Sequence, residues 1–182
     1  MFNQFLEAVD VRSSAWLVPT LARLVFAGVL LVYFWRSAAV KLGDGLFGFI
    51  NPTPGAYVQI FPKAMEAVGY DQSQLSILHT LVVIAGTWGE LLLPLLIIVG
   101  FLTRLAALGM IAFVVVQSIV DIYGHGVGGK DLGAWFDSAS GSLILDQRSF
   151  WMFLFLIILL KGAGPISLDR FLPAIGGVGR SN

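Results

Sequence analysis

Two charged side chains lie inside long apolar runs of this sequence, and they are the first candidates for chemistry. Glu90 lies in the middle of residues 77–100, and Arg23 lies within residues 16–35. A charge near the centre of a bilayer is costly, so each side chain needs a partner or a role. Counted from the ends of their runs, both would lie about 10–15 Å from the same interface. The sequence therefore predicts an intramembrane ion pair, which either fixes helix register or serves as a proton or quinone site.

A second group of polar residues is predicted near the other ends of the helices. Gln117, Asp121 and His125 are spaced by four and would share one helix face, and His79 lies near the start of another run. With Tyr33 they could surround an outer polar pocket, where a quinone head group would find hydrogen-bond donors and a titratable group. The alternative is a set of interfacial side chains that face water.

The composition limits the classes of protein. Hydrophobic residues make up 57% of the 182 residues and charged residues 12%, about half the charged share of a soluble domain. This predicts an integral membrane protein in contact with the lipid bilayer. The net charge is zero, which argues against nucleic-acid binding. Without cysteine and with two histidines, neither an iron–sulfur cluster nor a haem is expected, and no spacing predicts a metal site.

Four apolar runs predict an all-α membrane protein, a four-transmembrane-helix antiparallel bundle in a single domain over residues 1–182. The fourth run reaches bilayer thickness only if Arg148 and Lys161 extend to opposite interfaces. The runs are 16–35, 77–100, 105–122 and 147–164.

Two long connections lie on the side of the bundle away from the termini. Apolar residues recur with helical spacing in residues 57–68, which predicts an amphipathic cap segment on the outer face, with Pro62 at a helix start or kink. Residues 123–146 carry six glycines, which predicts a flexible lid. Basic residues are denser on the side of the termini, which favours both termini in the cytoplasm.

Four motifs in order resemble the DoxX family of small four-helix membrane proteins. The first joins Arg23, Gly28 and Lys41-Leu42, and the second is Gly89-Glu90. The others are the turn Gly100-Phe101-Leu102-Thr103-Arg104-Leu105-Ala106-Ala107-Leu108 and the stretch Gly162-Ala163-Gly164-Pro165-Ile166-Ser167-Leu168-Asp169.

This resemblance implies a bacterial or archaeal inner (plasma) membrane protein, multi-pass, with both termini cytoplasmic. Relatives include the DoxD-type subunit of thiosulfate:quinone oxidoreductase, and others look like partners of redox or metal-handling proteins. One hypothesis is an accessory subunit of a redox system, possibly quinone-linked, with a membrane or soluble redox partner protein. Another is a small-solute or lipid carrier, or a membrane assembly factor for a redox or metal-handling partner. A third is a structural anchor, and none of these assigns a catalytic residue.

Overall fold

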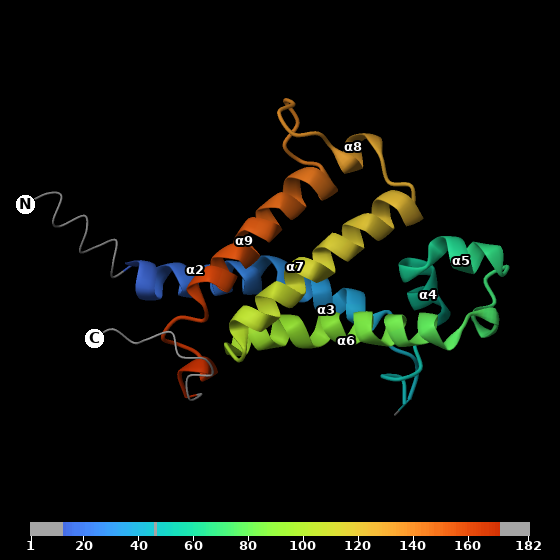
Figure 1. Ribbon diagram of the computed structural model, residues 1–182, viewed down its shortest axis with the longest axis horizontal. Helices are drawn as coiled ribbons and strands as arrows, with labels where there is room; N and C mark the ends of the chain where they lie inside the picture. The colour runs from blue at the N-terminus through green and yellow to red at the C-terminus, as the bar shows by residue number, and fades with distance from the viewer. Residues whose placement is uncertain (1–12, 46, 172–182) are drawn as a thin grey trace, which may run out of the picture.

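Four long helices form the body of the molecule, which the computed structural model describes over residues 13–45 and 47–171 (Figure 1). Each is long and apolar enough to cross a membrane. No strand occurs within those ranges. The predicted all-α fold with four spans is therefore confirmed. The spans are Ser13–Ala39, Ile77–Val99, Thr103–Gly124 and Leu143–Lys161.

Three of the four spans combine α-helix with short, wider π-helical segments. The first span extends beyond the predicted run 16–35 at both ends, whereas the second span is α-helix throughout. The first consists of η1 (Ser13–Leu17), α2 (Val18–Phe26), η2 (Ala27–Leu31) and α3 (Val32–Ala39). The second is α6 (Ile77–Val99). The third is α7 (Thr103–Ile119) followed by η4 (Val120–Gly124), and the fourth is η5 (Leu143–Gln147) followed by α9 (Arg148–Lys161).

The helices pack in pairs around an aromatic core. Helix α9 lies against α2 and α7, while α6 lies against α3 and α7. Phe26, Phe34 and Phe155 are fully buried between them, and the rings of Phe26 and Phe155 meet edge to face at 5.8 Å. Because these rings pack between the helices, they set how far each helix is shifted along its neighbours. That shift decides which polar side chains of neighbouring helices lie close enough to bond.

A tight turn joins α6 and α7 at one end of the bundle, which we call the turn end. Gly100 adopts a φ of 71°, and a Cβ there would lie 2.5 Å from the Cβ of Ser167, so only glycine fits. The Asp169 carboxylate accepts the backbone N–H groups of Leu102 (2.6 Å) and Thr103 (3.0 Å) at the start of α7. Residues after the fourth span therefore hold this turn by hydrogen bonds, and the carboxylate that accepts them belongs to η6 (Leu168–Phe171).

Two short helices cover the opposite end of α6, which we call the cap end. Helices α4 (Pro54–Ile60) and α5 (Pro62–Ala67) lie beside the far end of α6, where α6 and α7 have diverged (Figure 1). Tyr57 and Met65 are buried against Val83 of α6. Pro62 begins α5, as the sequence predicts, because a proline in the first turn of a helix has no backbone hydrogen bond to lose.

Short helices also occur in the two long connections at the cap end. The segment η3 (Gln72–Gln74) leads into α6, and α8 (Gly129–Leu132) lies in the glycine-rich connection between the third and fourth spans. The indole N–H of Trp135 donates to the Leu145 carbonyl at 3.0 Å, which ties this connection to the start of the fourth span.

Candidate functional site

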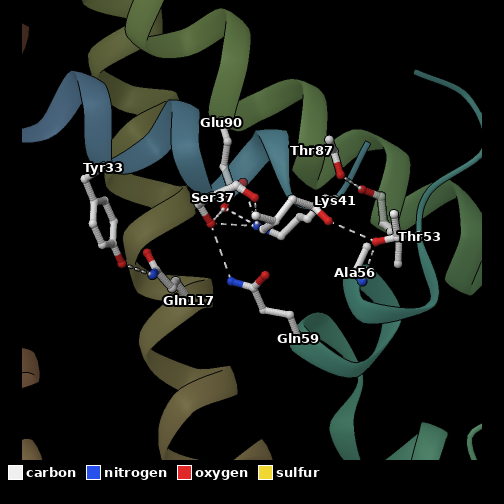
Figure 2. A network of polar contacts seen from close by, with 11 residues as sticks. Tyr33, Ser37, Lys41, Thr53, Ala56, Gln59, Thr87, Glu90 and Gln117 are labelled. Carbon is white, nitrogen blue, oxygen red and sulfur yellow. Dashed lines mark hydrogen bonds and ion pairs between the residues drawn. The ribbon is translucent and has the colours of Figure 1, made fainter. Parts of the chain in front are cut away.

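A buried ion pair between Lys41 and Glu90 is the centre of the candidate site (Figure 2). The Lys41 Nζ donates to both Glu90 oxygens, at 2.7 Å to Oε1 and 2.6 Å to Oε2. Ser37 lies one helical turn before Lys41; its hydroxyl accepts from Nζ at 2.8 Å and donates to Glu90 Oε1 at 3.1 Å. Lys41 is 2% exposed and Glu90 is 3% exposed. Glu90 therefore has a partner inside the protein, but the partner is Lys41.

The chain folds back after α3 so that Lys41 can reach Glu90. The Lys41 N–H bonds the Ala38 carbonyl at 3.0 Å, and the Lys41 carbonyl accepts from the backbone N–H of Thr53 at 3.0 Å. The Thr53 hydroxyl also donates to the Val40 carbonyl at 3.1 Å and accepts from the N–H of Ala56 in α4. Lys41 is thus held from both sides by the end of α3 and the start of the cap.

Burial and pairing act on the Lys41 ammonium in opposite directions. Burial lowers the pKa of Lys41 from its ordinary value, and the Glu90 carboxylate opposes this by attraction and hydrogen bonding. The ammonium satisfies its hydrogen-bonding capacity with Glu90 and Ser37. A buried pair of this kind can move a proton only if a partner or ligand reaches its edge.

A cavity of about 390 Å³ reaches that edge, between the diverging helices α6 and α7. Its wall includes Lys41 and Glu90 at one side and Gly86, Gly89 and Gly109 on the two helices. Four small or β-branched residues of the wall are exposed on the outside of the bundle, two from each helix: Val82, Ala85, Ala112 and Val116. Because these apolar residues belong to helices long and apolar enough to cross a membrane, we expect the mouth between them to face the bilayer.

Three further polar residues stand in the cavity wall towards the cap end. Gln59 comes from α4, Gln117 from α7 and Asp121 from η4. The Gln59 amide donates to Ser37 Oγ at 3.4 Å, and the Gln117 amide donates to the Tyr33 hydroxyl at 2.8 Å (Figure 2). The cavity is therefore apolar along α6 and α7, and its polar residues lie beside the Lys41–Glu90 pair and towards the cap end.

A second ion pair joins the buried Arg148 to Asp121, a partly exposed residue of the cavity wall towards the cap end. Arg148 is 3% exposed, and its guanidinium donates to Asp121 at 2.5 Å and to Ser118 Oγ at 2.9 Å. The prediction that Arg148 extends to the interface is wrong, because Asp121 supplies a carboxylate inside the bundle. Lys161 at the other end of the span is exposed and bonds Ser14.

The predicted ion pair between Arg23 and Glu90 is wrong. Arg23 donates instead to backbone carbonyls at the turn end: Ile97 (2.8 Å), Ile98, Ala163 (2.8 Å) and Ile166 (2.5 Å). Ile97 lies seven residues after Glu90 in α6, which is about 10 Å along the axis. The two charges therefore lie at different depths, and Arg23 donates to carbonyls where α6 ends.

The residues of the predicted outer pocket divide into two sets. Gln117 and Asp121 lie in the cavity wall, and Tyr33 contacts Gln117 through its hydroxyl. His79 bonds the Ser76 hydroxyl at 2.8 Å and packs edge-on against the ring of Phe61, outside the set of lining residues. His125 also lies outside that set, and its Nε2 bonds the Gln59 carbonyl at 3.0 Å. His125 thus joins the third span to the cap.

Sequence reasoning did not include Lys41, Ser37, Gln59 or Arg148 in the site. A signal for Lys41 was present, because Ser37 and Lys41 are four residues apart and would share a helix face. The fold-back after α3 depends on the bonds from Thr53 to Val40 and Lys41, and no residue spacing in the sequence predicts them.

A second hollow, of about 460 Å³, lies between η2 and α9 on another side of the bundle. Apart from Gln147, its lining consists of apolar or aromatic residues such as Val29, Leu30 and Phe153. No ion pair borders it among the described residues.

Comparison with known protein families identifies a match. The DoxX family model matches residues 18–121, which include Arg23, Lys41, Glu90 and Asp121. No curated protein and no solved structure matched the chain.

Proposed function

Because the chain belongs to the DoxX family and is a multi-pass membrane protein, we propose that it is an accessory subunit of a membrane redox system. In this proposal the α6–α7 cavity binds a quinone-class molecule that enters from the bilayer. The observation that carries it is the buried Lys41–Glu90 pair in the wall of a cavity between two apolar spans.

The shape and lining of the cavity suit a flat ring with an apolar tail. A volume of about 390 Å³ is within the range of small-molecule sites. Val82 and Val116 at the mouth would contact the tail, while the ring would lie towards Glu90 and Gln117. A quinone and its hydroquinone differ by two electrons and two protons. Glu90 and Asp121 would each exchange one proton with an oxygen of the bound ring. Lys41 would stabilise the Glu90 carboxylate, and a redox partner protein would exchange the two electrons.

A ligand assay tests this proposal directly. The purified protein should contain bound quinone, detected by solvent extraction, ultraviolet spectrum and mass spectrometry. Ala112→Phe places a ring in the mouth and should lower the quinone content at least about tenfold. Val115→Phe is the matched control, because Val115 is 45% exposed on the same helix but does not line the cavity. It should leave the content unchanged.

The other outcomes of the same assay oppose the proposal. A quinone-free extract in which one phospholipid is lost from Ala112→Phe, and not from Val115→Phe, would favour a lipid carrier. Equal quinone in all three proteins would mean that the quinone is carried by the surrounding detergent and lipid.

We also propose that both termini are cytoplasmic and that the cap end faces outward. Alkaline phosphatase is active only outside the cytoplasm. A fusion after Asp137, in the glycine-rich connection, should be active, and a fusion after Arg180 should be inactive. The reverse activities would place the cap end in the cytoplasm.

A further inference from the structure

The polar groups in the α6–α7 cavity wall have more unused hydrogen-bond acceptors than donors. Asp121 Oδ2 accepts from Arg148, and no described group bonds its second carboxylate oxygen. Gln117 Oε1 is buried and has no partner among the described residues. Glu90 Oε2 accepts from Lys41 alone. A carboxylate or amide oxygen can accept two hydrogen bonds, so each of these atoms has spare capacity.

Most of the donors in the same wall are already used. The three protons of the Lys41 ammonium are directed to Glu90 and Ser37. One of the two N–H groups of the Gln117 amide donates to the Tyr33 hydroxyl at 2.8 Å, and Gln117 Oε1 has no partner among the described residues. Gln59 has a spare N–H, but its side chain is exposed at the cap end of the cavity. The wall therefore offers a ligand more acceptors than donors.

We infer that the α6–α7 cavity binds a hydrogen-bond-donating amphiphile, and that among quinone-class molecules it selects the hydroquinone over the quinone. This inference rests on the proposed function for the identity of the ring. A hydroquinone carries two O–H donors and meets the acceptors of Glu90, Gln117 and Asp121. A quinone carries only acceptor carbonyls, which would face other acceptors and lose their bonds to water.

Two probe pairs test the inference in the full-length protein. Decylubiquinol and decylubiquinone differ in redox state, while 4-decylphenol and 4-decylanisole differ in one O–H and are not redox-active here. Binding is measured by isothermal titration in one detergent, with protein-free micelles as the blank. The chain has no cysteine, so a reductant that keeps the quinol reduced leaves the protein unchanged. In each pair the donor should bind about tenfold tighter, the worth of one buried hydrogen bond.

Variants test whether Gln117 causes the preference for hydrogen-bond donors. Because partition of the probes into micelles is the same for every variant, a change in the affinity ratio reports on the protein. Gln117→Leu should reduce the donor-to-acceptor affinity ratio towards one. Tyr33→Phe should reduce the same ratio less, because it keeps the amide but frees it to turn its N–H inward. The matched controls, Gln147→Leu in the other hollow and the exposed Tyr70→Phe, should keep the wild-type ratio.

The outcomes separate this inference from the proposed function. Equal or tighter binding of decylubiquinone overturns the inference and leaves quinone binding standing. A preference for the phenol over the anisole, with no binding of either quinone form, supports a donor-selective cavity and contradicts the quinone role. If none of the four probes binds, both the inference and the proposed function are overturned. A preference for donors that persists in Gln117→Leu would remove Gln117 from the site.

Discussion

Replacing either Lys41 or Glu90 alone should lower the free energy of unfolding by about 3–5 kcal/mol, because the remaining charge stays buried without its partner. Lys41→Met and Glu90→Leu are suitable single variants, since both residues are at most 3% exposed. The double variant leaves neither charge and should lose less than either single variant. In thermal unfolding in detergent, the single losses correspond to a fall in melting temperature of roughly 10 °C.

The control for this cycle uses charges that the protein does not bury. Lys63 and Glu66 on α5 are exposed, and Lys63→Met and Glu66→Leu should each change stability by less than about 0.5 kcal/mol. If the losses of Lys41→Met and Glu90→Leu simply add in the double variant, the two side chains are not coupled. That result would contradict the ion pair on which the site is built.

Replacing Arg23 should destabilise the protein by a similar amount, for a different reason. Its guanidinium bonds four carbonyls on two segments, at the end of α6 and after α9. Arg23→Leu leaves these carbonyls without a charged donor, at an expected cost of about 3–5 kcal/mol. Arg23→Lys should recover at most half of the loss, because an ammonium cannot span the positions that the planar guanidinium reaches. Thermal unfolding of the three proteins measures both effects.

A second cycle distinguishes this role from pairing with Glu90. Arg23 and Glu90 lie at different depths, so the losses of Arg23→Leu and Glu90→Leu should add to within about 0.5 kcal/mol. A double variant more stable than both singles would show that Arg23 and Glu90 interact after all. Full rescue by Arg23→Lys would show that charge alone, and not the forked geometry, holds the turn end together.

The lengths of the apolar runs and the residues that start or end helices were sufficient to predict the fold. Apolar runs of bilayer length identify the four spans, and the spacing around Pro62 identifies the cap, because both signals are local in the chain. The ends were less accurate: the first span continues to Ala39, four residues past the predicted end. That extension carries Lys41 to the depth of Glu90.

The partners of the buried charges were not predictable in the same way. The sequence-based pairing of Arg23 with Glu90 counted residues from the ends of the apolar runs to estimate the depth of each charge. That count assumes that the helices are straight and begin at the same interface. Here α6 extends past α3 towards the cap, so Glu90 meets the end of the first span and Arg23 meets the end of the second. Arg148 shows the same problem, because its proximity to a span end suggested exposure, whereas Asp121 keeps it buried.

Photo-crosslinking with an azido-quinone gives the most direct test of the central claim that the α6–α7 cavity is a ligand site. The account predicts label on peptides from residues 82–93 and 109–121, which contain most of the cavity wall. Ala112→Phe should abolish this label, while Val115→Phe should retain it. Label confined to residues 25–30 and 147–157, the segments of the second hollow, would contradict the account, as would cavity label that Ala112→Phe does not reduce.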